Sequence, residues 1–445
     1  MHTLAGLTQH DPLVTSPVPV PTAVRRPGPA VAAVVAVAVL AALCTAGLAG
    51  CTPPASGGQH NPGGRHGPGG RSPAAVASNG ISQAAGRPPP PGRASNAFHL
   101  LPARGRGHLA PGSDPHALPG DVLIADEGNN RLLLVDPRGR IRWKFPRRGD
   151  MPHGHVFGPP DDAFIAPGGH AIIATQEMHD TVSVINIATR HITRRYGHPG
   201  VPGSAHGYFS HPDDAMLLPG GDLLVADIMN CRILLISPGR WHVRRQFGRT
   251  SSCRHHPPAR FGSPNGVFPL DDGHFLVTEI NGDWVDEMSL RGHVYWSRHP
   301  PGVGYPSDAN EVGRGRYLVA DYSDPGQVVI FGRSGRALWR FRPGGKRALN
   351  HPSLALPLPN GNILVNDDYN DRVIVIDRRT KRIIWQYGHR GVPGRAAGYL
   401  DNPDGVDLSP PDSLLITHAA GWGARDHSGR RTGTGRIQPR AQPPA

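Results

Sequence analysis

The sequence predicts an all-β fold, a β-propeller of four-stranded blades, from three observations. A short apolar run recurs at intervals of 42 to 52 residues. A turn rich in Pro and Gly and a phrase beginning with Pro precede most copies, and two further strand-like runs follow most of them. Each repeating unit therefore holds four short strands, and radial closure protects the edges that a flat array of such sheets would expose.

The apolar run is predicted to be the second strand of each unit. It is too short for a helix and rich in β-branched residues, as is typical of a buried strand. Its copies end at Asp126, Gln176, Asp227, Glu279, Asp321, Asp367 and His418.

The phrase upstream of it is predicted to open the first, innermost strand. Its copies begin at Pro160, Pro212, Pro264, Pro306, Pro352 and Pro403. The third strand is read in "RLLLVD", "RILLIS" and "RVIVID", and the fourth carries Trp143, Trp296, Trp339 and Trp385 in four units. The Gly- and Pro-rich phrase at 196–214, written again at 387–405, is predicted to connect one blade to the next.

Six units are complete, and a seventh contributes only "GVDL" and "SLLITH". The sequence favours seven blades, with outer strands supplied from elsewhere, such as "NAFHLLPA" at 96–103. Six blades remain open, in which case the seventh copy overlaps the short first unit.

Residues 196–237 resemble an NHL repeat: an aromatic-Gly opening, a Gly-rich loop, Pro at the strand start, and Asp-x-x-Asn-x-Arg before an apolar strand. That last element recurs at Asp126/Asn129/Arg131, Asp227/Asn230/Arg232 and Asp367/Asn370/Arg372. The three other blades depart from it. The Trp-ending strands resemble quinoprotein and arylsulfotransferase-type propellers more weakly.

We interpret the Asp-x-x-Asn-x-Arg elements as structural. They fall at the hairpin between the second and third strands, where Asn tolerates a left-handed turn and Asp and Arg can pair across it.

The candidate site lies where the innermost strands begin. Asp162, Asp214, Asp308 and Asp404 are expected to ring one mouth of the central channel, beside connections that carry His211 and His351. Hard oxygen donors suit Ca²⁺, and imidazole beside carboxylates suits Zn²⁺. Asp214, Asp308 and His418 are the candidate metal ligands, although no cofactor is established by the sequence.

The chain ends differ from this repeating body. Residues 30–50 form an uncharged apolar run after Arg25 and Arg26, and its exit, Leu48-Ala49-Gly50-Cys51, resembles a bacterial lipobox. The sequence therefore predicts an export segment at 1–51 with lipid on Cys51. A retained single-pass helix is the alternative. Either arrangement places the rest of the chain on the outer side of the cell membrane.

Residues 52–113 and 420–445 are rich in Pro, Gly and Arg and are predicted to be a disordered tether and tail around a propeller at 114–419. The net charge of +13 comprises +7 in residues 1–113 and +4 in residues 420–445, which leaves +2 for the body. A nucleic-acid partner is excluded because the body has no basic patch.

In a compartment that permits disulfides, Cys231 and Cys253 are expected to pair across loops on the same face.

These features favour a membrane-tethered, extracytoplasmic binding module for a small molecule, glycan or protein. The alternative is an enzyme of the same shape, since propellers that resemble NHL proteins include metal-dependent lyases and lactonase-like hydrolases. Its site would lie at the mouth of the channel. No nucleophile elbow, P-loop or dinucleotide fingerprint is present.

Overall fold

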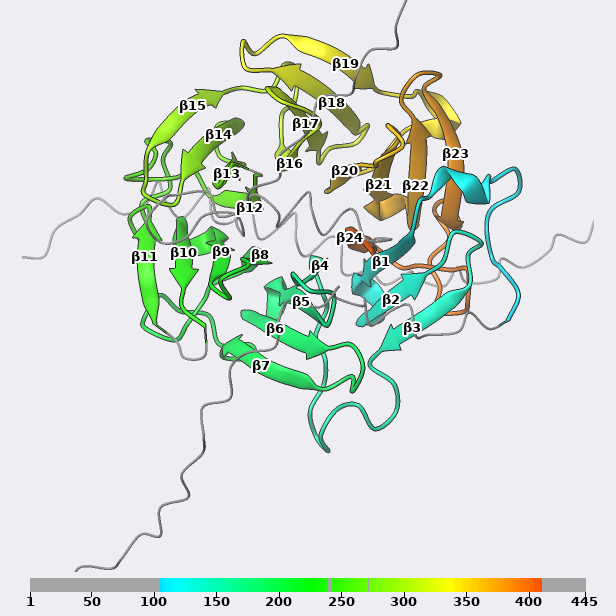
Figure 1. Ribbon diagram of the computed structural model, residues 1–445, viewed down its shortest axis with the longest axis horizontal. Coiled ribbons are helices and arrows are strands. Elements are labelled where there is room, and N and C mark those ends of the chain that lie inside the picture. The colour runs from blue at the N-terminus through cyan, green and yellow to red at the C-terminus, as the bar shows by residue number, and fades with distance from the viewer. Residues whose placement is uncertain (1–104, 239–241, 271, 410–445) are drawn as a thin grey trace, which may run out of the picture. The chain divides into compact units, whose positions relative to one another are not determined.

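The computed structural model describes residues 105–238, 242–270 and 272–409. They form six four-stranded antiparallel sheets arranged as the blades of a propeller (Figure 1). Blade 1 contains β24 (Pro403–Ser409), β1 (Asp121–Asp126), β2 (Arg131–Val135) and β3 (Ile141–Phe145). Blade 2 contains β4 (Ala163–Ile165), β5 (Ala171–Gln176), β6 (Thr181–Asn186) and β7 (Ile192–Gly197). Blade 3 contains β8 (Pro212–Leu217), β9 (Leu223–Asp227), β10 (Arg232–Ile236) and β11 (Val243–Phe247).

The other three blades follow the same order from the axis outward. Blade 4 contains β12 (Pro264–Pro269), β13 (His274–Glu279), β14 (Trp284–Ser289) and β15 (Val294–Arg298). Blade 5 contains β16 (Pro306–Glu311), β17 (Arg316–Asp321), β18 (Gln327–Gly332) and β19 (Ala337–Phe341). Blade 6 contains β20 (Ala355–Pro357), β21 (Ile363–Asp367), β22 (Arg372–Asp377) and β23 (Arg382–Gly388). The short 3₁₀ helices are η2 (Pro115–Ala117), η3 (Glu127–Asn129), η4 (Glu177–His179), η5 (Ile228–Asn230), η6 (Gly345–Arg347) and η7 (Asp368–Asn370).

The described residues form six blades, not the seven that the sequence favours. The strand that begins the seventh copy, β24, pairs with β1, in a register that sets Asp121 opposite Ser409 and Val122 opposite Leu408. It thus supplies the innermost strand that the short first unit lacks. The seventh copy therefore completes the first blade, which is the six-blade alternative given by the sequence analysis. "SLLITH" and residues 96–103 lie outside the described residues.

The core lies between neighbouring blades. One buried cluster joins Leu123 and Trp143 of blade 1 to Ile165 and Ile172 of blade 2, and similar clusters fill the other interfaces. Trp side chains on outer strands add hydrogen bonds across these interfaces. Trp143 Nε1 donates to Ile187 O at 2.9 Å, and Trp385 Nε1 donates to Pro137 O at 2.9 Å, so the second bond links blade 6 to blade 1.

The Asp-x-x-Asn-x-Arg elements hold the connections between blades. Asp227 pairs with Arg232 at 2.7 Å, and Arg232 NH1 donates to Ser204 O and NH2 to Tyr208 O in the preceding connection. Asn230 Nδ2 donates to Asp227 and to Gly203 O. Asp126, Asn129 and Arg131 make the corresponding contacts with the connection at 387–405, which explains why that phrase is written twice.

One detail of the expected turn was wrong. The left-handed residue is the one after the motif Asn: Asn130, Cys231 or Asp371, with φ of 51°, 54° and 53°. The Asn itself ends the short helical turn, and its side-chain amide donates to the motif Asp. The repeated Gly after the aromatic residue has a structural reason as well. A Cβ on Gly197 or Gly388 would come within 2.1 or 2.3 Å of the carbonyl oxygen of Asp180 or Asp371.

The described chain begins before the first strand. Leu109, in the segment that composition assigns to the tether, bridges to Tyr387, and Ala110 N donates to Gln386 O.

Among the described residues no helix is long and apolar enough to cross a bilayer. The apolar run at 30–50 and Cys51 lie outside this part of the chain.

Candidate functional site

The innermost strands bring carboxyl groups from several blades to one end of the propeller axis. Pro212, which opens β8, pairs with Asp227, which ends β9, and blades 1, 4 and 5 have the same register. The start of each inner strand is therefore level with the connections between blades. The residues directly after each Pro face their counterparts from neighbouring blades at this level.

Three of the four predicted aspartates meet there. Asp162, Asp214 and Asp308 each place a carboxylate oxygen within 4.8 Å of the others, and Asp161, Asp162 and Asp213 form a second such group. All five side chains are buried. Asp404, the fourth predicted aspartate, is partly exposed and lies beside Asp161 and Asp368.

Sequence reasoning missed three further acids that belong to this group. Glu127, Glu177 and Asp368 each follow the last residue of a second strand and open a short helical turn. The signal was present one position beyond the recurring strand, where the six blades have Glu127, Glu177, Ile228, Ile280, Tyr322 and Asp368. We define the axial acidic cluster as Glu127, Asp161, Asp162, Glu177, Asp213, Asp214, Asp308, Asp368 and Asp404.

Burial raises the pKa of every member of this cluster. For seven of the nine, the negative charge of neighbouring carboxyls is the next cause. The pKa of Glu127 rises to about 8, and those of Glu177 and Asp214 to about 7. Two carboxylates 4 Å apart repel by about 1 kcal/mol in water and by about 4 kcal/mol at the effective dielectric of a protein. The cluster therefore favours any ligand that brings positive charge.

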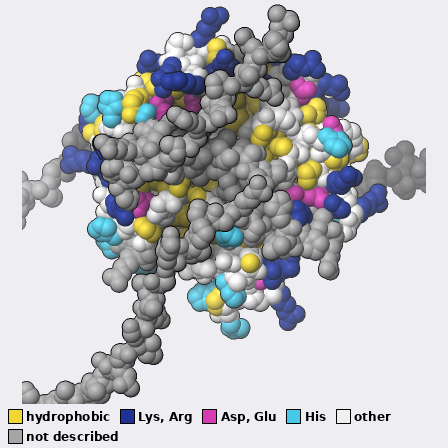
Figure 2. All heavy atoms as spheres, viewed as in Figure 1, with side chains coloured by type: hydrophobic (Ala, Val, Ile, Leu, Met, Phe, Trp, Pro, Cys, Tyr) yellow, Lys and Arg dark blue, Asp and Glu magenta, His cyan; other side chains and the backbone are white. Residues whose placement is uncertain are grey.

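The described residues supply no such charge. None of the ion pairs in this part of the chain involves a member of the cluster. Lys and Arg side chains lie around the outer edge of the propeller face in Figure 2. One buried oxygen of each of Asp162, Asp213, Asp214, Asp308 and Asp368 accepts no hydrogen bond from a donor among the described residues.

Two glycines leave room for these oxygens. A Cβ on Gly266 would lie 2.2 Å from Asp308 Oδ1, and a Cβ on Gly405 would lie 2.5 Å from Asp162 Oδ1. Both oxygens are among those without a donor. Any larger residue at either position would therefore displace a carboxylate from the cluster.

Tyrosines border the cluster on one side. Burial and then the charges of Asp213, Glu177, Asp161 and Asp404 raise the pKa of Tyr305. Burial, Asp404 and Asp368 similarly raise the pKa of Tyr322, whose hydroxyl donates to Tyr369 at 3.3 Å.

The two predicted histidines lie in different surroundings. His351 packs against Tyr322 and Tyr369, at ring separations of 4.8 and 4.5 Å, and its Nδ1 lies 2.7 Å from Asn350 Oδ1. Burial lowers the pKa of His351. His211 lies beside Asp180 instead, with its Nδ1 3.9 Å from Asp180 Oδ1. His418 lies outside the described residues.

The structure joins Cys231 to Cys253 by a disulfide, with a Cα separation of 5.1 Å. Cys231 is the left-handed residue of the β9–β10 turn, and Cys253 lies in the connection that follows β11. The bond therefore fixes that connection to blade 3.

No protein-family description and no curated protein matches this sequence. Among solved structures, a protein of unknown function from Bacteroides caccae is similar at 17% identity and a TM-score of 0.46, over 65% of this chain and 98% of that one. A streptogramin B lyase is similar at 14% identity and 0.43, over 69% and 88%. A structure of the nidogen/laminin complex gives 11% identity and 0.44, over 64% and 97%. The fold assignment rests on the sheet topology of this chain itself.

Proposed function

We propose that the protein is a cation-dependent binding module whose axial acidic cluster holds a divalent ion such as Ca²⁺. The observation that carries the proposal is the set of buried carboxylate oxygens, facing one another across the axis without a hydrogen-bond donor or a cationic side chain among the described residues. Ca²⁺ takes six to eight oxygen ligands and tolerates irregular geometry, which suits carboxylates contributed by several blades.

A bound cation would also give the module its ligand preference. Exposed coordination positions on Ca²⁺ favour hydroxyl and carboxylate oxygens, so an oxygen-rich small molecule or glycan is the favoured class of ligand. The rings of Tyr305 and Tyr322, whose pKa values the cluster carboxyls raise, offer apolar faces near the ion.

We further propose that the propeller is attached to the outer side of the cell membrane through lipid on Cys51. The lipobox-like exit of the apolar segment supports this, and a retained helix at 30–50 is the alternative anchor.

Terbium titration tests the cation site, because Tb³⁺ replaces Ca²⁺ in oxygen sites and its luminescence is sensitised by nearby tyrosine. We expect Tyr-sensitised emission that Ca²⁺ suppresses by competition. Asp214→Asn combined with Asp308→Asn should weaken Tb³⁺ binding at least tenfold. The double variant Asp114→Asn with Asp377→Asn removes two carboxylates outside the axial acidic cluster and outside the other groups of potential metal ligands, and it is the matched control.

Each outcome of this titration decides the question. Both double variants should keep the circular dichroism of the wild type. Equal Tb³⁺ affinity in the two double variants would overturn the proposal, as would an absence of sensitised emission from the wild type.

A further inference from the structure

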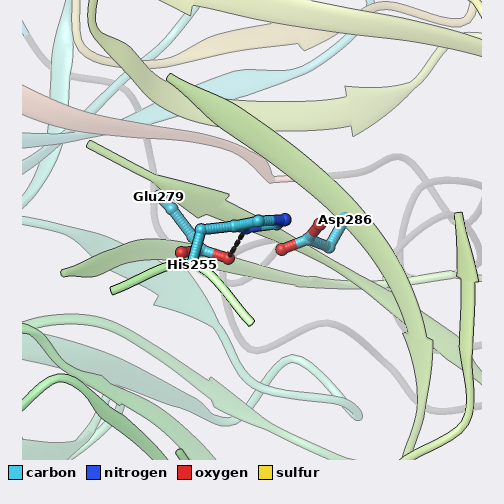
Figure 3. Close-up of side chains that lie close together, drawn as sticks. All are labelled: His255, Glu279 and Asp286. Carbon is cyan, nitrogen blue, oxygen red and sulfur yellow. Dashed lines mark hydrogen bonds and ion pairs between the residues drawn. The ribbon is translucent and has the colours of Figure 1, made fainter. Parts of the chain in front are cut away.

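A second group of potential ligands lies on the second and third strands of blade 4 and on the connection that precedes this blade. His255, Glu279 and Asp286 each place one nitrogen or oxygen within 4.8 Å of the others. Figure 3 shows the imidazole of His255 between the two carboxyl groups. His255 Nδ1 lies 2.9 Å from Glu279 Oε1, while Glu279 Oε2 accepts a hydrogen bond from Gly262 N.

The structural role of the blade accounts for two of these residues. Glu279 occupies the position of Asp227, and it holds the preceding connection as Asp227 does. The register places Trp284 where blade 3 has Arg232, so no arginine is available as its partner. His255, from the connection itself, contacts Glu279 instead.

Asp286 has no such role. Its strand partner is Val277. The equivalent residues of the other blades are Leu133, Ser183, Leu234, Val329 and Ile374, so none of them carries a charge. Ser183, the one polar residue among them, donates to Gln176 at 2.6 Å. The Asp286 side chain is fully buried, and neither of its oxygens accepts a hydrogen bond from a donor of good geometry in the described chain. Glu279, Ser297 and His255 are the polar side chains that interact with Asp286, and burial raises its pKa well above its usual range. A buried carboxyl of this kind costs several kcal/mol unless it gains a partner.

We propose that His255, Glu279 and Asp286 form a binding site for a divalent transition-metal ion of the Zn²⁺ type. One imidazole and two carboxylates are ligands that such ions accept, at bonds of about 2.0 to 2.2 Å. Donors at those distances lie roughly 3.3 Å apart, which small side-chain rotations reach from the present arrangement. The ion would neutralise the buried Asp286 and Glu279 together.

The surroundings fix the imidazole and leave a path to it. His255 stacks on Trp284 at 3.9 Å with an interplanar angle of 6°, and Trp284 in turn contacts His299 at 3.7 Å. The disulfide anchors Cys253, two residues before His255. The His255 side chain is 21% exposed, so a fourth coordination position can open toward solvent.

A neighbouring cluster of the same residue types shows the contrast. Asp272, His274 and Glu287 also lie within 4.8 Å of one another. There, however, Glu287 accepts hydrogen bonds from Trp296, Tyr317 and the guanidinium of Arg333. Its charge is already compensated, so a metal ion gains little, and His274 provides the matched control.

Cobalt spectroscopy on the intact chain tests the site, because Co²⁺ in a low-symmetry site with imidazole ligation has visible absorption bands that hydrated Co²⁺ lacks. We expect one equivalent of Co²⁺ to develop these bands and Zn²⁺ to abolish them. His255→Ala and Asp286→Asn should each weaken Co²⁺ binding at least a hundredfold, whereas His274→Ala should leave it unchanged.

Two further variants keep the result interpretable. Asp286→Leu introduces the residue that blade 3 has at this position, so it should fold, be more stable without metal than the wild type, and lose the bands. Asp214→Asn with Asp308→Asn should retain them, which separates this site from the axial one. Bands that persist in Asp286→Leu, or that vanish only in the axial double variant, would overturn the proposal.

Discussion

At the scale of single residues, the same position serves different purposes in different blades. Asp227 holds a connection between blades with Arg232 as its partner, whereas Glu279 does so with His255. The residue that ends the second strand thus determines which neighbouring side chain becomes its partner. Asp407, on the innermost strand β24, joins two blades in a different way. Its carboxylate accepts hydrogen bonds from Ile165 N of blade 2 and from Leu408 N, both at 2.8 Å.

The pH dependence of Asp407 gives a prediction. Burial raises its folded-state pKa to about 7, from an ordinary value of 3.8. Between about pH 4 and pH 7 the folded state holds a proton that the unfolded state has released, so rising pH destabilises the fold through this group. Urea unfolding with a metal chelator should show the wild type losing up to about 1.4 kcal/mol per pH unit relative to Asp407→Asn, and no further loss above pH 7. A constant difference between pH 5 and pH 8 would contradict it.

At the scale of elements, the connection from β11 to β12 depends on its disulfide. Cys231 and Cys253 are 22 residues apart, and closing a loop of that size contributes roughly 3 kcal/mol in the chain-entropy model. We expect a reductant to lower the thermal unfolding midpoint of the wild type by several degrees and to leave Cys231→Ser with Cys253→Ser unaffected. Mass spectrometry of the non-reduced protein should find the two cysteines joined. A wild-type midpoint indifferent to reductant would argue against this role.

The strands themselves were predictable because their signals are local. Runs such as "VLIAD" and "LLVAD" are apolar, β-branched and bounded by turns, and they became β1 and β9. The number of blades, in contrast, could not be predicted from local sequence. It depends on whether β24 pairs with β1, and that pairing is set by closure of the ring rather than by either strand alone.

The candidate sites divide in the same way. Asp162, Asp214 and Asp308 could be predicted because each lies two residues after the Pro of the phrase that recurs before the second strand. Glu127, Glu177 and Asp368 look like ordinary turn residues until the blades are superimposed. Asp286 lies inside β14, and only the strand register shows that the other blades place an uncharged residue there.

At the scale of the whole molecule, charge is distributed unevenly along the chain. The strongly basic segments lie at 1–113 and 420–445, while the body between them is nearly neutral. A basic tether next to a lipid anchor would interact favourably with anionic lipid, at about 1 kcal/mol for each residue close to the surface.

The anchor is tested by metabolic labelling with a fatty acid in a bacterial host. We expect Cys51→Ala to abolish labelling and to leave unprocessed precursor, while Cys44→Ala, in the same segment, serves as the control and stays labelled. Label retained in Cys51→Ala, together with an intact N-terminal segment in the wild type, would favour a single-pass helix instead.

The pairing of β24 with β1 also has a consequence for synthesis. Blade 1 cannot be completed until the residues around Ser409 have left the ribosome, since they provide its innermost strand. The five other blades can each form from contiguous sequence, but the first must wait with an open edge facing water. Long-range pairings of this kind form slowly because the loop that separates the two strands must be closed first. Nascent chains released early would therefore be incomplete at the first blade as well as at the last.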